Sequence, residues 1–374
     1  MFLRRLNRFV IECSLGGRAE RAYLPNPGRL RELLLPGSLL YLVENRKNST
    51  AKLPYTAVAV EREGTPVLLH THLSNRVVEQ LLEQKRIPGL QDAEVVRAEA
   101  PCGKSRFDFL LRKEGKPFFL EVKSCTLFEG PIAMFPDAVT ERGRRHLTEL
   151  AALARSGTAG GVVFLVHWSR AEYFLPDYHT DIAFSRTFLD VRKDLLIKAV
   201  GIGWGADLSL ETGPRELEIP WHIIEEEAED SGSYILILRL SADAVVEVGK
   251  LGTISFPKGY YLYVGSAATH LKKRIERHLR KRKTFFWHID FLRDHADQCV
   301  ALPIRSRDRL ECAIARSLHD IAQRRVPGFG ASDCSCPTHL FAMDENPQNN
   351  RKFIEMLLHF RMGRLQEKII QIPA

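Results

Sequence analysis

Ser105–Lys123 reads SRFDFLLRKEGKPFFLEVK and has the alternating apolar pattern of a β-hairpin. Alternation places Asp108 on one face of the first strand, and it places Glu121 and Lys123 together on one face of the second. A symmetric turn over residues 114–117 would set Asp108 opposite Lys123 and diagonal to Glu121, at separations of roughly 5 and 7–8 Å. The stretch therefore predicts two carboxylates and an amine gathered on one face of a sheet.

These three residue types suit metal-dependent hydrolysis of a phosphodiester. Mg²⁺ prefers a few carboxylates while it keeps several waters, and a bound metal activates water and neutralises developing charge. A nearby lysine can orient or deprotonate the attacking water. The alternative is structural, with an ion pair between Asp108 and Lys123 and an exposed Glu121. Because the spacing D-x12-E-x-K is loose, the pattern alone favours this structural alternative.

Longer motifs change that balance. The chain contains LNRF (Leu6–Phe9), LPNPGRL (Leu24–Leu30), ELLLPG (Glu32–Gly37), EVKSCTL (Glu121–Leu127) and FPDAVTERGRRHLTEL (Phe135–Leu150). Through these motifs the chain, up to about residue 225, resembles the sugar fermentation stimulation protein (SfsA) family. The resemblance implies an OB-fold barrel, a PD-(D/E)xK nuclease-type domain of mixed α/β structure, and DNA binding.

The same resemblance implies roles for individual residues. Asp108 and Glu121 match metal ligands and Lys123 matches the catalytic lysine, with Mg²⁺ or Mn²⁺ as the expected cofactor. It also implies a further carboxylate from a preceding helix, for which Glu79 is the best match. The alternative for Glu79 is a solvated helix residue in an ion pair.

Composition indicates a basic protein of several domains. The 374 residues exceed the usual size of one core, and the net charge of +8 with a pI near 9.1 favours a polyanionic partner. We expect nucleic acid, and DNA in preference to RNA. No apolar run approaches the ~20 residues of a membrane span, so we expect a cytoplasmic protein without a membrane partner. The oligomeric state is not predicted.

Apolar runs and turns divide the chain into four parts. FVIEC, SLLYLVE, YTAVAVE and TPVLLH, separated by Gly- and Pro-containing turns, predict a small antiparallel barrel over 1–70. A mixed α/β domain follows over 71–228. Its expected segments are a helix from Asn75, a strand over 94–98, the hairpin, a helix over 140–154 and a strand over 162–167. The acidic run Glu225–Asp230 would repel nucleic acid and indicates a spacer or a solvated helix end. A domain over 229–345 and a helical extension over 346–374 follow it.

Two groups in the first half are candidates for phosphate contacts. Arg29 ends the rigid PNPGR turn, which would present its side chain to a phosphate. The alternative is that the turn is only a proline-stiffened connection. Arg142, Arg145 and His146 have the i, i+3, i+4 spacing of one helix face, and a solvated face is the alternative. Asp137, just before this helix, is expected to be an N-terminal cap-region residue and not a metal ligand.

The second half resembles a domain of unknown function placed in the GIY-YIG nuclease superfamily, over about 230–345. The matching motifs are GSY (Gly232–Tyr234), YVG (Tyr263–Gly265), RIERHLR (Arg274–Arg280), WHIDFL (Trp287–Leu292) and GFGASDCSC through THLF (Gly328–Phe341). The resemblance implies an α+β fold in which Tyr234 and Tyr263 flank the water and scissile phosphate. It implies that Arg274 stabilises charge and that Glu311 binds a metal. Ser233 and Val264 replace isoleucines of the superfamily, so packing of the tyrosines in a sheet is the alternative.

A basic run followed by aromatic residues lies in this half. It comprises Lys272, Lys273, Arg274, Arg277, Arg280, Lys281, Arg282 and Lys283, with Phe285, Phe286 and Trp287 next in the chain. Cations beside aromatic platforms suit a nucleic-acid backbone and its unstacked bases. His278, one helical turn after Arg274, is expected to face the same phosphate. A solvated face is the alternative for the run.

The seven cysteines are scattered and odd in number, which does not fit a disulfide framework. Cys334-x-Cys336-x2-His339 lacks the paired spacing of a structural zinc site, so a local structural role is expected and zinc is the minor alternative. The sequence thus predicts two nuclease-like modules that cleave nucleic acid with a divalent metal. The alternative is a DNA-binding regulatory protein in which one or both nuclease folds are inactive. A scaffold that docks an acidic protein is a third, less favoured hypothesis.

Overall fold

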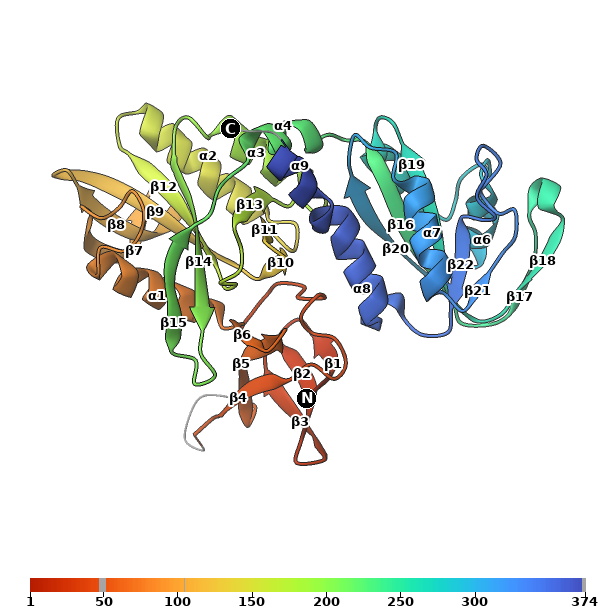
Figure 1. The fold of residues 1–374 in the computed structure, drawn as a ribbon, viewed down its shortest axis with the longest axis horizontal. Coiled ribbons are helices and arrows are strands. Elements are labelled where there is room, and N and C mark those ends of the chain that lie inside the picture. The colour runs from red at the N-terminus through yellow and green to blue at the C-terminus, as the bar shows by residue number, and fades with distance from the viewer. Residues whose placement is uncertain (47–51, 104, 372–374) are drawn as a thin grey trace. The chain divides into compact units, whose positions relative to one another are not determined.

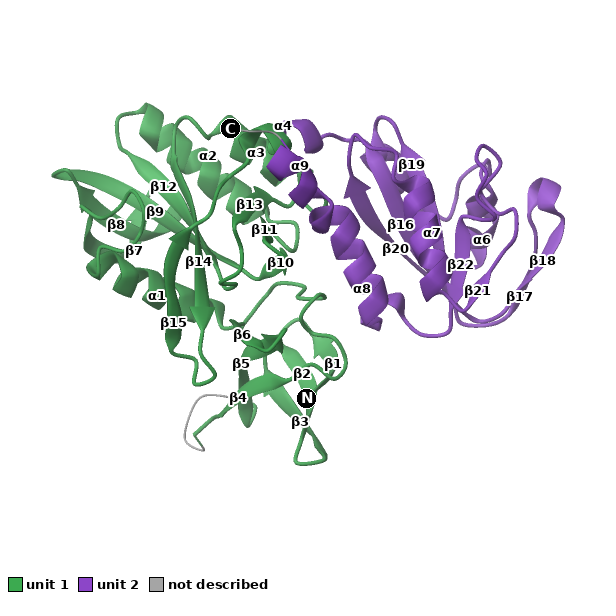
Figure 2. Cartoon of the chain, in the orientation of Figure 1, with its two compact units in different colours: residues 1–224, 372–374 green, residues 225–371 purple. Residues whose placement is uncertain are grey.

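The structure is a computed structural model that describes residues 1–46, 52–103 and 105–371. The chain divides into two compact units, which we call unit 1 (residues 1–224) and unit 2 (residues 225–371) (Figures 1 and 2). Among the described residues, every helix is too short or too polar to cross a bilayer.

The first part of unit 1 is a curled sheet. Its strands are β1 Phe2–Asn7, β2 Val10–Leu15, β3 Arg18–Tyr23, β4 Leu40–Glu44, β5 Tyr55–Arg62 and β6 Thr65–Leu68. They pair in the order β1-β2-β3-β5-β4, with β6 beside β5. The backbone N–H of Phe2 donates to the carbonyl of Ser38 over 2.7 Å, so β1 meets the segment before β4 and the sheet curls back on itself. The expectation of wholly antiparallel pairing is wrong in one place, because β3 and β5 run parallel.

The second part of unit 1 is a mixed α/β layer structure (Figure 1). Its elements are α1 Thr71–Glu83, β7 Glu94–Cys102, β8 Ser105–Lys113, β9 Lys116–Cys125, β10 Leu127–Glu129, β11 Ile132–Phe135, α2 Glu141–Arg155, β12 Gly160–Val166, β13 Tyr173–Pro176, α3 Ile182–Asp190, β14 Leu196–Trp204, β15 Leu210–Glu216 and α4 Trp221–Glu227, which crosses the unit boundary. The main sheet has the order β15-β14-β12-β9-β8-β7, and β10, β11 and β13 form a small second sheet. The central strand β12, GGVVFLV, is buried throughout and pairs in parallel with both neighbours, as expected for a continuous apolar run.

The β8–β9 hairpin turns within fewer residues than the sequence suggested. Residues 114 and 115 both have positive φ, 50° and 77°, and form a two-residue turn. The ladder runs to the pair Phe109–Leu120, so Asp108 and Glu121 are the next positions opposite one another. The prediction that Asp108 lies opposite Lys123 is therefore wrong, because it assumed a four-residue turn.

Unit 2 has an α+β arrangement around one antiparallel sheet. Its elements are β16 Gly232–Leu240, β17 Ala244–Glu247, β18 Thr253–Phe256, β19 Gly259–Ala267, α5 Leu271–Leu279, α6 His288–His295, β20 Gln298–Arg305, α7 Glu311–Ile321, β21 Arg324–Arg325, β22 Leu340–Met343, α8 Arg351–Leu358 and α9 Leu365–Gln371. It also has two short 3₁₀ helices, η1 Gly249–Leu251 and η2 Pro347–Asn349, and one π-helical segment, η3 His359–Gly363. The sheet has the order β20-β16-β19-β22-β21. The apolar strand β16 lies between β19 and β20, with Leu236 and Leu238 in the core.

The C-terminal segment is helical, as predicted, and packs within unit 2. Nε of Arg361 donates to the carbonyl of Pro303 over 3.0 Å, and Arg364 and Lys368 both contact the carboxylate of Glu227. The run begins at the end of helix α4, but Glu227 is fully buried, so the expectation of a spacer or a solvated helix end is wrong at this residue. Residues 372–374 of the predicted extension lie outside the described residues.

Candidate functional site

Asp108, Glu121 and Lys123 lie together on the β8–β9 hairpin of unit 1. Nζ of Lys123 contacts Oε1 of Glu121, which is only 4% exposed. The backbone N–H of Val122 donates to Oδ2 of Asp108 over 2.7 Å. The structure therefore brings the three predicted side chains into one cluster, although with a register that differs from the predicted one.

Helix α1 reaches this cluster through an amide. Nδ2 of Asn75 donates to Oδ1 of Asp108 over 2.8 Å. Glu79, the predicted third carboxylate, lies one turn further along α1 and is half-buried. The sequence did not identify Asn75, but its i−4 spacing from Glu79 places it on the same helix face, which was the available signal.

His146 supports the cluster from helix α2. Its ring is 2% exposed, and Nδ1 lies 2.6 Å from Oε1 of Glu121 while Nε2 accepts from Nε of Arg142 over 3.4 Å. The expectation that His146 belongs to a phosphate-binding surface is therefore wrong, because Glu121 holds the ring inside the protein. Arg142 and Arg145 are exposed, and Arg145 lies 3.9 Å from Glu149.

A buried histidine couples α1 to the strand that carries the cluster. Nε1 of Trp204 donates to Nδ1 of His167, so the proton of His167 is on Nε2, which lies 3.0 Å from Oγ of Ser124 and 3.2 Å from Oγ of Ser74. Burial lowers the pKa of His167 to about 3, so the ring is neutral. Because Ser74 precedes Asn75 and Ser124 follows Lys123, this network sets how α1 approaches the hairpin.

The two carboxylates of the cluster have different electrostatic environments. Burial and the neighbouring Glu121 raise the pKa of Asp108 to about 6. Burial also opposes ionisation of Glu121, but His146 and Lys123 outweigh it and hold its pKa below the ordinary value. Oε2 of Glu121 is buried and accepts no hydrogen bond from the described residues. Two adjacent carboxyl groups with a bare buried oxygen are the donor set that a hard cation prefers.

A pocket of about 320 Å³ opens beside the cluster within unit 1. Its lining includes Asn75, Lys123 and Ser124 from one part of the unit, and Arg8 and Pro27 from the curled sheet and its loops. A substrate in this pocket would therefore contact both parts of unit 1.

Asp137 holds the PNPGR turn at the edge of this pocket. Its Oδ2 accepts from the N–H of Leu30 over 3.1 Å, and a Cβ on Gly28 would lie 2.4 Å from the same oxygen, so only glycine fits there. The expected role of Asp137 in capping the helix is wrong, since the N-cap of α2 is Thr140. Arg29 is exposed, so its side chain is accessible to a ligand.

In unit 2, residues from four elements surround a second pocket, of about 280 Å³. Tyr234 on β16, Tyr263 on β19, Arg274 on α5 and Glu311 at the start of α7 all line it. The ring of Tyr234 crosses Gly265, where a Cβ would lie 2.4 Å from the phenol oxygen. Gly265 is therefore required because the ring of Tyr234 occupies the space where a Cβ would lie.

A chain of hydrogen-bonding groups continues from Tyr234 into the core. The phenol oxygen lies 2.9 Å from Nε2 of His278, and Nδ1 of His278 lies 3.5 Å from Oδ1 of Asp290. Burial raises the pKa values of Tyr234 and Tyr263, so both phenols are neutral hydrogen-bonding groups. Burial also opposes ionisation of Asp290, but His278, Arg277 and Lys283 outweigh it and lower its pKa.

The predicted basic surface divides into an exposed and a structural set. Arg277 donates twice to Asp290, and Nζ of Lys283 lies 2.7 Å from Oδ1 of Asp290 with only 6% of its side chain exposed. The expectation that His278 and Lys283 face nucleic acid is therefore wrong, because both side chains are buried against Asp290. Arg277 also binds Asp290, but 29% of its side chain stays exposed, so its contact with nucleic acid stays a prediction. The exposed set consists of Lys272, Lys273, Arg280, Lys281 and Arg282, and we call it the basic surface.

Aromatic side chains lie next to the basic surface. Phe285 and Phe286 are exposed, at 39% and 77%, whereas Trp287 is stacked by Arg277 and Arg274 at 4.2 and 5.2 Å from its ring centre. The sequence did not identify Asp290, because one acid after a basic and aromatic stretch gives no signal of its own.

Comparisons with known proteins match both halves of the chain. Family models match as "SfsA N-terminal OB domain" over residues 3–69, "Sugar fermentation stimulation protein RE domain" over 72–203 and "Domain of unknown function DUF123" over 233–362. These are the two families that the motifs predicted, so that prediction is confirmed. The domain of unknown function DUF123 is the GIY-YIG-like family.

Curated relatives and a solved structure agree with these matches. The sugar fermentation stimulation protein homolog of Carboxydothermus hydrogenoformans is 43% identical over 50% of this chain and 80% of its own length. The homolog of Methanosphaera stadtmanae is 38% identical over 50% and 78%. The structure of Pyrococcus furiosus SfsA in complex with Ca²⁺ is 32% identical, with a TM-score of 0.51, over 58% of this chain and 93% of that chain.

Proposed function

The chain belongs to the sugar fermentation stimulation protein family, and from this premise we propose that it binds nucleic acid and that unit 1 hydrolyses phosphodiester bonds with a divalent metal. We assign Asp108, Glu121 and Lys123, which lie on adjacent strands, the metal-ligand and lysine roles of a PD-(D/E)xK nuclease. The observation that carries the proposal is the buried, unpaired Oε2 of Glu121 beside the raised pKa of Asp108. A cation between these two carboxyl groups would satisfy both features.

The solved relative supports the binding of a hard cation by a protein of this family. The Pyrococcus furiosus protein is in complex with Ca²⁺, which binds oxygen ligands as Mg²⁺ and Mn²⁺ do. In this chain Asp108 and Glu121 would hold the metal, which when bound would activate water and neutralise charge on the phosphate. We infer Mg²⁺ or Mn²⁺ as the physiological ion, because Mg²⁺ keeps waters that can attack.

The side chains around the metal position have separable roles. His146 donates to Glu121 and keeps it ionised, and Asn75 orients Asp108 through its amide. The ammonium group of Lys123 lies against Glu121. There it would donate a hydrogen bond to the attacking water and orient it, whereas only the neutral amine would be able to take the proton of that water. The pocket beside Lys123 accommodates the phosphodiester.

Cleavage assays on the full chain test the proposal. Labelled single- and double-stranded DNA and RNA are incubated with Mg²⁺, Mn²⁺ or EDTA, and cleavage is expected only with metal. Glu121→Gln should remove the cleavage that unit 1 carries out. Glu94→Gln is the matched control, because Glu94 lies on the neighbouring strand β7 with 74% of its side chain exposed. Equal cleavage by both variants would contradict the assignment.

A second candidate function is favoured by the basic surface of unit 2. Five exposed cations beside the exposed Phe285 and Phe286 suit the backbone and unstacked bases of a nucleic acid. DNA is the preferred partner, as in the sequence-based expectation. Salt-dependent DNA binding without cleavage by any metal would replace the nuclease proposal with a DNA-binding regulatory protein.

A further inference from the structure

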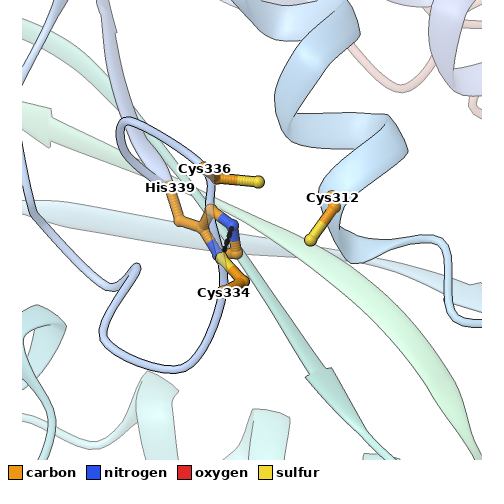
Figure 3. A group of neighbouring side chains, drawn as sticks. All are labelled: Cys312, Cys334, Cys336 and His339. Carbon is orange, nitrogen blue, oxygen red and sulfur yellow. Dashed lines mark hydrogen bonds between the residues drawn. The ribbon is translucent and has the colours of Figure 1, made fainter.

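Three cysteines and a histidine of unit 2 converge at one point (Figure 3). Cys312 comes from the first turn of α7, while Cys334, Cys336 and His339 come from the segment before β22. Their ligand atoms all lie within 4.8 Å of one another. We propose that Cys312, Cys334, Cys336 and His339 form a structural zinc site in unit 2.

The separations are close to those that a zinc ion requires. Zinc binds thiolate sulfur at about 2.3 Å in a tetrahedral set, which places neighbouring sulfurs about 3.8 Å apart. The cluster therefore needs to contract by no more than about 1 Å to close on an ion. The sequence argument against zinc depended on the missing second half of the ligand set. The fold supplies it from α7, which local spacing could not show.

The histidine is already oriented for ligation. His339 is 1% exposed, and its Nδ1 lies 3.0 Å from Oε1 of Glu311 while its Nε2 lies 3.4 Å from Sγ of Cys334. With the proton on Nδ1 donated to Glu311, the lone pair of Nε2 faces the sulfurs. A carboxylate behind a zinc-binding histidine is the usual second contact of such sites, because it fixes the ring and its tautomer.

The chemistry of the four ligands selects zinc among the common ions. Three thiolates and an imidazole are soft or borderline donors, whereas Mg²⁺ and Mn²⁺ prefer oxygen. A full set of four protein ligands leaves no open position, which is the mark of a structural site. The zinc site is thus distinct from the predicted magnesium or manganese positions at Glu121 and Glu311.

Such a zinc ion would fix one wall of the unit 2 pocket. It would join the start of α7, which carries Glu311, to the segment that carries Gly330, Ser332 and Asp333. All four of these residues line the pocket. Zinc would therefore set the position of Glu311 without taking part in any reaction there.

Metal analysis of the full chain tests the site independently of nuclease activity. Tag-free protein purified under reducing conditions should contain about one zinc per chain by mass spectrometry of metals. Titration with a mercurial reagent should release that zinc as three thiols react. Replacement by Co²⁺ should give the visible bands of a tetrahedral ion and the near-ultraviolet bands of thiolate ligands.

Matched variants separate the site from general effects of cysteine loss. Cys312→Ser and Cys336→Ser should lose stoichiometric zinc, while Cys299→Ser, on β20 of the same unit, should retain it. If a variant does not fold, the wild-type protein still tests the site: its zinc is removed with a chelator, Co²⁺ is added, and the spectrum of the Co²⁺ form is recorded. Any one of three results would overturn the proposal. The first is a wild-type protein that contains no zinc and gives no thiolate–Co²⁺ spectrum. The others are the absorbance of an iron–sulfur cluster and a disulfide bond among these cysteines. Zinc content should be unchanged in Glu121→Gln, so this test and the nuclease test can fail separately.

Discussion

Nδ1 of His146 lies 2.6 Å from Oε1 of Glu121, and both side chains are buried. A hydrogen bond donated to a carboxylate away from water favours its charged form. The pKa of Glu121 is therefore lowered although burial acts in the opposite direction, whereas the pKa of Asp108 is raised to about 6. The pair therefore consists of one carboxyl group whose pKa is held below its ordinary value and one whose pKa is raised to about 6.

Glu121→Gln and Lys123→Ala should each reduce cleavage by unit 1 by at least about 100-fold, because these groups act on the metal and the water. DNA affinity should stay within a few-fold, since neither group serves mainly to position the backbone. The measurement is single-turnover cleavage beside equilibrium binding, both with Glu311→Gln as background to exclude unit 2. A parallel loss of binding and cleavage would instead indicate a role in binding.

Asp108→Asn should stabilise the metal-free protein at pH 8. The folded pKa of Asp108 lies above its value of about 3.9 in an unfolded chain, so the native state holds the extra proton between about pH 4 and 6. Wild-type stability therefore falls as pH rises through this range, and ionised Asp108 beside Glu121 costs about 2–3 kcal/mol above it. The melting-temperature advantage of Asp108→Asn in EDTA should accordingly shrink as pH is lowered to about 4.5.

Divalent metal provides the control for this pH dependence. Mg²⁺ or Mn²⁺ binds the ionised pair, so it should raise the melting temperature of the wild type at pH 8 but have little effect on Asp108→Asn. A variant that is less stable than the wild type at pH 8 in EDTA would contradict the role of Asp108 as a strained carboxylate.

The hairpin and its acidic face could be predicted because alternation is a local property of the sequence. The register could not, because it depends on Glu114 adopting a positive φ, which a non-glycine residue seldom does. Asn75 and His146 reach the carboxylates through helix packing. Spacing along one helix gives the face on which each residue lies, as for Asn75 and Glu79, but it does not give the strand that this face contacts. The full ligand set around Cys336 was missed for the same reason, since Cys312 belongs to another element.

The basic run shows the same limit in a different form. A run of charges usually marks a solvated face, and composition cannot reveal that Asp290 turns Lys283 inward.

Lys281→Ala with Arg282→Ala should therefore lower the slope of log affinity against log salt by about 0.9 per lost duplex contact. Lys283→Met should leave the slope unchanged but lower the free energy of unfolding by about 1–3 kcal/mol, because it removes a partner of a buried carboxylate. An unaltered slope in the double variant would mean that the basic surface is only solvated.

Gly265→Ala should destabilise unit 2 by about 1–3 kcal/mol, because the new Cβ would overlap the phenol of Tyr234. Tyr234→Ala removes the overlapping ring, so the double variant should be more stable than the sum of the single changes predicts. Denaturant unfolding of the three variants measures this coupling. Additive effects would show that the ring does not occupy the space above Gly265.

Glu311 is expected to serve two metals in different ways, and two substitutions separate them. Glu311→Gln removes the charge that a catalytic Mn²⁺ needs, but it keeps an oxygen that can accept from Nδ1 of His339. Titration calorimetry with Mn²⁺, in a Glu121→Gln background, should lose the heat of the unit 2 site while zinc content stays near one per chain. Glu311→Ala also removes the contact to His339 and should weaken zinc about 10–100-fold in competition with a chelator. If Mn²⁺ gives no heat with Glu311 intact and DNA still binds, unit 2 is a targeting module, and unit 1 alone carries the proposed nuclease activity.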